Sequence, residues 1–395
     1  MPAPGRDRLS NIDLLRGLVM VVMALDHVRD FFSNALAVNL RNPDEVTAPL
    51  FLTRWVTHFC APTFVLLAGV GAALTARRLS KPQLARFLIT RGLWLVLLEL
   101  TLVRLGFYFT FDFHDLSGLV IWALGWCMVL LGVIQFLPTP AILAFALILI
   151  CGHNAMDTWK PAEYGFPSWL WGVLHGDGHI VLGSQNNYII ETPYKIIPWV
   201  GVMAYGFWLG PLFQLPQVIR RQFFFRLGVI TVLAYFALRA MNGYGDPVPW
   251  WEPVKIRSWT ASAISFFNCV KYPPSLCYLL MTLGPAFLLL AAFDREPGWL
   301  GRRIVVLGRV PLFYYLLHLP LIHGLAVLCS YVQNDGLVDA WLISPPALTT
   351  APPDYGYSLP IVYAVWIAVV VILYTPCAWF AEQKRKHPGG WRSYF

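Results

Sequence analysis

Residues 12–32 read IDLLRGLVMVVMALDHVRDFF, and this stretch decides what kind of fold the chain forms. It begins with the charged residues Asp13 and Arg16, becomes apolar, and then places Asp26 next to His27. Eleven residues separate Arg16 from His27, which is roughly 16 Å along a helix with a rise of about 1.5 Å per residue. An ionisable pair so deep in an apolar helix is costly in lipid unless it faces protein or water. In a membrane protein such a pair therefore indicates a functional site.

The composition of the whole chain agrees with a membrane protein. Its 395 residues are 57% hydrophobic and only 13% charged, with a mean hydropathy of +0.59. A soluble domain usually carries about twice that charged fraction. We therefore predict an all-α polytopic integral membrane protein, a single domain over residues 1–395 embedded in a lipid bilayer. The ten predicted spans are 12–33, 54–76, 87–110, 118–137, 139–152, 195–213, 223–240, 273–293, 307–330 and 358–380.

The distribution of basic residues predicts the orientation of these spans. If the N-terminus is inside, 19 of the 29 lysines and arginines fall on short inner connections. The positive-inside rule then places both termini in the cytoplasm. The same bias explains the net charge of +8, so no nucleic-acid partner is expected. The seven cysteines are scattered singly and are typical of buried thiols.

Two histidines and an aspartate are candidates for catalysis, namely His27, His58 and Asp26. A neutral imidazole at His27 can act as a general base toward an amine or hydroxyl, or as a nucleophile that accepts an acyl group. The neighbouring Asp26 points about 100° away on a helix, so it either binds substrate or orients another helix. His58, at the outer start of the second span, is the alternative catalytic histidine. A purely structural polar cluster, or an interfacial position for His58, is the competing interpretation.

Further polar residues are candidates for substrate binding. Glu99 lies in the middle of the third span with Arg104 five residues later, a spacing that does not favour a mutual pair on an α-helix. We predict that each pairs with a partner on another helix, the alternative being a proton or substrate pathway. Asn268 and Lys271 lie just before the eighth span and are predicted to line the site, the alternative being simple capping of that span. If the reaction is an acyl transfer, these two residues and Arg54 are the candidate donors to the developing oxyanion.

Several common sites are not predicted. The sequence contains no P-loop, dinucleotide fingerprint, HExxH motif or nucleophile elbow. His318 and His323 are five residues apart and lie on different faces of one helix, so they do not predict a metal site. His175 and His179 have a metal-like spacing but belong to a glycine-rich loop. We therefore expect no metal cofactor.

Three segments carry a resemblance to a known family, namely RLSNIDLLRG leading into MALDH, HFCAPTFVLLAG, and GRVPLFYYLLHLPLIH. With these segments the chain resembles bacterial relatives of heparan-alpha-glucosaminide N-acetyltransferase. The Asp-x-x-Arg-Gly opening, with a histidine eleven residues after the arginine, is also similar to that of membrane O-acyltransferases that decorate bacterial polysaccharides.

The resemblance implies a reaction and a place. Acetyl-CoA would bind from the cytoplasmic side of a bacterial inner membrane, with Arg16 among the inner arginines that attract its phosphates. The acetyl group would pass to a sugar amine or hydroxyl on the outer face. His27 matches the first-helix histidine of the O-acyltransferases. In the lysosomal enzyme the catalytic histidine follows the first span, but residues 33–57 here contain none, so His58 stays a candidate. A homodimer is left open.

A function of another class is also considered. A proton-coupled secondary transporter or flippase would use Asp26, His27 and Glu99 as a proton path. Such transporters commonly contain inverted repeats, and the sequence shows no internal repeat. Binding of acetyl-CoA by the purified protein would separate the two hypotheses.

Overall fold

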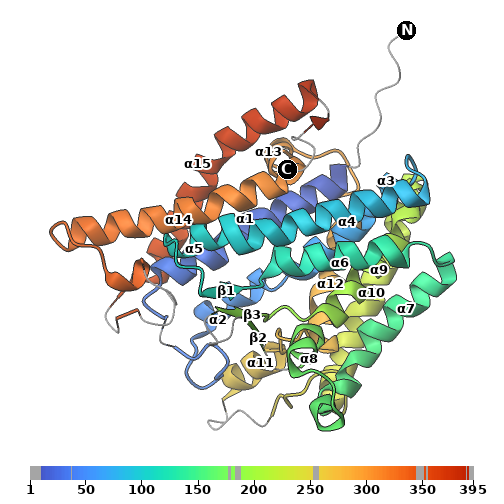
Figure 1. Cartoon of the computed structure of the whole chain (residues 1–395), viewed down its shortest axis with the longest axis horizontal. Coiled ribbons are helices and arrows are strands. Elements are labelled where there is room, and N and C mark those ends of the chain that lie inside the picture. The colour runs from blue at the N-terminus through green and yellow to red at the C-terminus, as the bar shows by residue number, and fades with distance from the viewer. Residues whose placement is uncertain are drawn as a thin grey trace.

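A computed structural model shows a bundle of long helices with one small sheet (Figure 1). It describes residues 10–36, 38–176, 179–182, 188–251, 258–343, 351–352, 355–387 and 389–390. The α-helices are α1 (Ser10–Phe32), α2 (Ala48–Thr57), α3 (Cys60–Ala76), α4 (Lys81–Leu98), α5 (Arg104–Tyr108), α6 (Val120–Ile134), α7 (Thr139–Gly152), α8 (Ser168–Leu174), α9 (Ile196–Leu209), α10 (Gln217–Met241), α11 (Trp259–Phe267), α12 (Leu276–Ala292), α13 (Trp299–Arg309), α14 (Pro311–Gln333) and α15 (Leu359–Lys386). Five short helical turns complete them: η1 (Glu99–Val103), η2 (His153–Met156), η3 (Pro161–Tyr164), η4 (Gly210–Gln214) and η5 (Ala340–Leu342).

Each of the ten predicted spans falls on helix. Within the described residues, six helical stretches are long and apolar enough to cross a membrane. The chain is therefore mainly helical and of the multi-pass membrane type, whereas the count of ten stays a prediction. The six stretches are Ala48–Ala76, Thr139–Met156, Ile196–Gln214, Gln217–Met241, Pro311–Gln333 and Leu359–Lys386.

The second predicted span is broken between α2 and α3. Proline has no N–H and cannot donate to the carbonyl four residues earlier, so Pro62 leaves the carbonyl of His58 without its helical partner. The hydroxyl of Tyr278 on α12 donates to that carbonyl at 2.8 Å. This hydrogen bond therefore connects the hinge between α2 and α3 to α12.

The third predicted span contains a turn of π-helix. The backbone N–H of Arg104 donates to the carbonyl of Glu99, five residues earlier, and closes the wider turn η1. Such turns are uncommon and often occur at functional sites. Because the wider turn brings residues five apart toward one face, it changes which side chains of this span point in the same direction.

Pairs of glycines bring neighbouring helices into backbone contact. Gly92 on α4 faces Gly125 on α6, and a Cβ added at Gly125 would lie 2.5 Å from the carbonyl oxygen of Gly92. Gly17 on α1 and Gly308 on α13 approach each other's helix backbones in the same way. Small residues of this kind are common where membrane helices pack tightly. They fix α6 against α4 and α13 against α1.

One end of the bundle is covered by irregular chain and a three-stranded sheet (Figure 1). Strand β1 (Asp115–Ser117) pairs parallel with β3 (Tyr188–Glu191), and β3 pairs antiparallel with β2 (His179–Leu182). Strand β1 lies directly between α5 and α6. The cover therefore connects the third and fourth predicted spans.

A buried arginine on α10 holds part of this cover. Arg239 donates hydrogen bonds to the carbonyls of Phe266, Val248 and Ser265 at 2.9–3.0 Å. Its guanidinium also lies 3.5 Å from the buried carboxylate of Asp246. Because both charges are buried, each depends on the other and on these carbonyls.

Candidate active site

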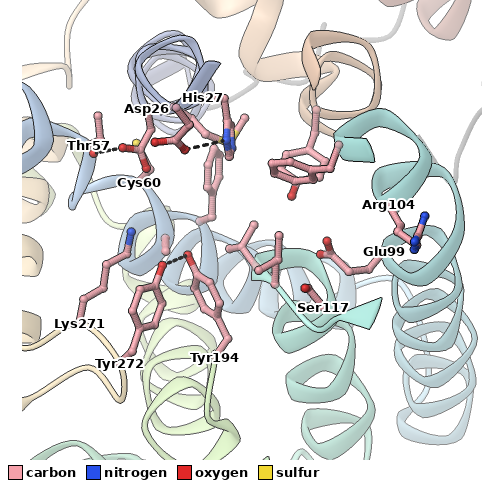
Figure 2. A pocket seen from close by; sticks show the side chains of 18 of the residues that line it. Asp26, His27, Thr57, Cys60, Glu99, Arg104, Ser117, Tyr194, Lys271 and Tyr272 are labelled. Carbon is pink, nitrogen blue, oxygen red and sulfur yellow. Dashed lines mark hydrogen bonds and ion pairs between the residues drawn. The ribbon is translucent and has the colours of Figure 1, made fainter. Parts of the chain in front are cut away.

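A cavity of about 250 Å³ lies where α1, the α2–α3 hinge and η1 meet. Figure 2 shows Asp26 and His27 of α1 on one side of it, with Lys271, Tyr272 and Tyr194 opposite. Glu99, Arg104 and Ser117 lie together at another end. The polar residues of its wall are Asp26, His27, Asp30, Thr57, Cys60, Glu99, Arg104, Tyr108, Ser117, Tyr194, Lys271, Tyr272 and Tyr315.

Asp26 is held in place by its neighbours. Its Oδ1 accepts a hydrogen bond from the Thr57 hydroxyl at 2.9 Å and lies 2.8 Å from Arg29 Nη2. The same Nη2 lies 2.8 Å from the carboxylate of Asp30. Arg29 thus lies between two carboxylates, and Asp26 contacts Arg29 and Thr57. This agrees with the prediction that Asp26 points away from His27.

Nδ1 of His27 lies near a carboxylate but makes no hydrogen bond within the described residues. The nearest carboxylate oxygen, on Asp30, is 3.7 Å away. The ring packs edge-on against Phe107 and lies 5.2 Å from the ring of His318, measured between centroids. A cavity-lining imidazole with an uncommitted nitrogen can accept a proton or an acyl group.

Lys271 brings a positive charge to the side opposite His27. Burial opposes its charged form, but the neighbouring Tyr272 and Asp26 outweigh burial and hold the pKa of Lys271 above its usual value. Its ammonium lies over the ring of Tyr272, 5.1 Å from the centroid, and Tyr272 is hydrogen-bonded to Tyr194 at 3.5 Å between hydroxyls. A cation fixed at this place can stabilise negative charge that develops on a substrate oxygen.

Glu99 and Arg104 bind backbone rather than opposite charges. Glu99 Oε2 accepts from the N–H groups of Ile121 and Trp122 at the start of α6, at 2.9 and 3.1 Å. Arg104 donates to the carbonyls of Asp115 and Thr110, both at 3.0 Å. Within the described residues neither has an ion pair. Glu99 has a partner on another helix, as predicted, but that partner is the backbone of α6 and not a charge.

The remaining predicted residues lie outside this cavity. His58 is buried with both ring nitrogens unpartnered in the described chain, 5.5 Å from the ring of Tyr278, and is not part of the wall of this cavity. Arg54 donates to Asn268 at 3.3 Å and to the carbonyl of Leu40 at 3.0 Å. Of the three predicted oxyanion donors, the cavity wall contains only Lys271.

A second cavity, of about 310 Å³, adjoins the first. The two share Phe64, Val120 and Tyr315 in their walls. Arg16, predicted to bind the cofactor, lines the second cavity together with Arg91. Arg16 donates to the carbonyl of Gly308 at 3.2 Å and lies 3.6 Å from Asp13.

One face of α1 connects the two cavities. Positions 16, 20, 23, 27 and 30 follow the three- and four-residue spacing of a single helical stripe. Arg16 and Met20 line the second cavity, whereas Met23, His27 and Asp30 line the first. The stripe therefore runs from a basic end to the cavity that holds His27.

Several residues of the site were not predicted. Four of them line the cavity from the ends of elements or from connections: Thr57 ends α2, Ser117 ends β1, and Tyr194 and Tyr272 lie in connections. Their signal in sequence is weak, although Tyr272 directly follows a predicted lysine. His318 was considered only for metal binding, yet it packs against His27. The part of the chain that the structure describes contains no group of three or more His, Cys, Asp or Glu side chains suited to a metal ion.

Comparison with known proteins supports the resemblance found in the sequence. The family model described as heparan-alpha-glucosaminide N-acetyltransferase, catalytic, matches residues 8–244, which is more than half of the chain. The match covers α1 to α10 and therefore includes most of the walls of both cavities. No curated protein matches the chain.

Proposed function

We propose a specific reaction for this chain, which belongs to the family of heparan-alpha-glucosaminide N-acetyltransferase catalytic domains. Membership indicates a membrane enzyme of the acyltransferase type. The proposed reaction transfers an acetyl group from cytoplasmic acetyl-CoA to an amine or hydroxyl of a sugar on the outer face of a bacterial inner membrane. Both termini are then cytoplasmic, as the basic inner connections predict.

The observation that carries this proposal is the stripe of α1 that connects two adjoining cavities. Arg16 at its start suits a phosphate group of the donor. The roughly 16 Å to His27 suits an extended pantetheine arm, which would lie along Met20 and Met23. The thioester would then reach His27 through the part of the wall formed by Phe64 and Tyr315.

The residues of the first cavity suit the chemistry of acyl transfer. His27 takes the proton from the acceptor amine or hydroxyl while that group attacks the thioester carbonyl. Lys271 stabilises the negative charge on the carbonyl oxygen. The carbon–sulfur bond then breaks, and the CoA thiolate takes up the proton that His27 removed from the acceptor. In the second form of the mechanism His27 itself attacks the thioester carbonyl, and CoA leaves as the thiolate. The acceptor then attacks the acetyl-histidine, the carbon–nitrogen bond to His27 breaks, and the acceptor's proton goes to the CoA thiolate.

The experiment uses purified protein in detergent or liposomes with acetyl-labelled acetyl-CoA and a panel of amino sugars. Loss of thioester and label retained on the protein are both followed for wild type, His27→Ala and His58→Ala. General base catalysis is worth about 10²–10⁴-fold, so His27→Ala should lower the rate by that factor. His58→Ala is the matched control, since it removes a histidine that lines neither cavity.

Three results would change the proposal. Loss of activity only in His58→Ala would move the catalytic role to the α2–α3 hinge. Label that stays on wild-type protein but not on His27→Ala would select the acyl-histidine form. A wild-type protein that neither binds nor consumes acetyl-CoA would favour the transporter hypothesis.

A further inference from the structure

The turn of π-helix directs two buried charges toward one cavity. Glu99 and Arg104 are five residues apart, and the bond from the Arg104 N–H to the Glu99 carbonyl closes the turn between them. Both side chains line the first cavity, although Glu99 is only 1% and Arg104 only 3% exposed. The π-turn is thus the local structure that lets both contribute to the same wall.

Each of these charges has one atom without a partner. Glu99 Oε2 is bound by α6 and two nitrogens of Arg104 are bound by carbonyls, so both side chains are fixed in orientation. In the described structure, Glu99 Oε1 and Arg104 Nη2 are buried with no hydrogen-bond partner. Buried polar atoms are normally satisfied, and leaving them unpaired costs about 1–3 kcal/mol, more for charged groups.

We propose that Glu99 and Arg104, with Ser117 beside them, form a subsite that binds ring hydroxyl groups of the acceptor. The inference rests on the proposed function and deepens it, because it assigns one end of the cavity to the part of the acceptor that does not react. The reacting amine or hydroxyl then lies toward His27. Glu99 and Arg104 position the acceptor.

Hydroxyl groups match this pair better than a charged group does. A carboxylate oxygen only accepts hydrogen bonds and a guanidinium only donates them, whereas a hydroxyl does both. The pair offers an acceptor oxygen and a donor nitrogen in one wall, so an uncharged polyhydroxy ring can satisfy both atoms, whereas an anion suits only Arg104 and a cation only Glu99. Phe107 and Tyr108 supply apolar surface for the C–H faces of such a ring.

The position of the subsite indicates that it binds the acceptor and not the donor. Glu99 and Arg104 line the first cavity and do not line the second, which holds Arg16. Arg104 is fixed by carbonyls of the connection between α5 and α6, at the end of the bundle away from Arg16. A volume of about 250 Å³ lies just below the roughly 300–1000 Å³ of pockets for drug-sized ligands, so it suits a single ring.

The test compares an amine with ring hydroxyls and an amine without them. The acceptors are D-glucosamine and cyclohexylamine, assayed with acetyl-CoA for wild type, Glu99→Gln and Arg104→Lys. Glu99→Gln keeps an acceptor for the α6 N–H groups, and Arg104→Lys keeps the charge. Asp294→Asn is the control, because it also neutralises a buried carboxylate, here one paired with Arg220, and Asp294 lines neither cavity.

We expect wild type to prefer D-glucosamine in kcat/KM by at least about 100-fold, since a site built for hydroxyls strongly rejects an analogue that lacks them. Each subsite variant should raise the KM for D-glucosamine roughly ten- to hundredfold. The KM for acetyl-CoA should stay near its wild-type value, because neither residue lines the cavity that holds Arg16. Asp294→Asn should keep the wild-type preference.

Several outcomes would overturn the subsite. An equal loss of acetyl-CoA affinity in both variants would assign the pair to the donor. Equal use of both amines by wild type, or use of neither while acetyl-CoA is still consumed, would show that no hydroxyl-binding subsite exists. If the variants do not fold, the wild-type preference alone decides. Failure of the proposed function is distinguishable, because acetyl-CoA would then be neither bound nor consumed.

Discussion

The backbone contact between Gly92 and Gly125 allows a stability prediction that does not depend on function. In Gly125→Ala the new Cβ lies 2.5 Å from the carbonyl oxygen of Gly92 and 2.8 Å from a methyl group of Val96. Ordinary contact begins near 3.4 Å, so α4 and α6 must separate by about 0.9 Å. Because the nearest atom is backbone, no side chain can move aside to relieve the clash.

Overpacking of this kind costs about 1–3 kcal/mol of unfolding free energy. One kcal/mol lowers the melting temperature by about 2–4 °C in domains of 150–250 residues, so a loss of several degrees is expected. The N–H groups of Ile121 and Trp122 would also move away from Glu99. This movement should weaken acceptor binding more than donor binding. Thermal unfolding of the purified protein in detergent, with fluorescence-detected size exclusion, measures the first effect.

Gly152→Ala is the matched control. It makes the same substitution at the end of α7, where an added Cβ meets nothing within 4 Å. This variant should melt with wild type or slightly above it, because alanine favours helix over glycine. If Gly125→Ala has the same melting temperature as Gly152→Ala, the close packing of α4 on α6 is refuted.

Two further predictions concern buried polar groups. Arg239→Met leaves Asp246 buried without its cation, which should cost about 3–5 kcal/mol and show as a large fall in melting temperature; an unchanged melting temperature would contradict the buried pair. Tyr278→Phe removes the donor to the carbonyl of His58, at a cost of about 1–3 kcal/mol. That cost should shrink when Pro62→Ala restores an N–H to the same carbonyl, and a double-mutant cycle with fully additive effects would contradict the link.

The sequence predicts the helices well because apolar runs of spanning length have few alternative structures. All ten predicted spans are helical, and the stripe of α1 from Arg16 to His27 was visible as a spacing of charges in an apolar segment. Lys271, which the sequence predicts to line the site because it directly precedes a span, lines the first cavity. These predictions depend on local pattern alone.

Other parts of the site depend on contacts that no local pattern contains. An α-helical spacing puts Glu99 and Arg104 on different faces, and only the π-turn brings them to one cavity. Thr57, Tyr194 and Ser117 reach the cavity through the packing of distant segments. The sequence does not predict helix α13, because three arginines interrupt its short apolar pattern. Its apolar face packs on α1.

The wall shared by the two cavities has a consequence for the membrane itself. If the proposed reaction joins the two sides of a bilayer, the protein must not become a leak for protons or ions. Phe64, Val120 and Tyr315 line both cavities and bring mostly apolar surface to the place where these adjoin, and such surface solvates water and ions poorly. The uncharged pantetheine arm proposed for this place would exclude water from it. In the proposed reaction only the acetyl group passes from donor to acceptor, so no whole solute crosses and the helices need not alternate between two openings as those of a carrier do.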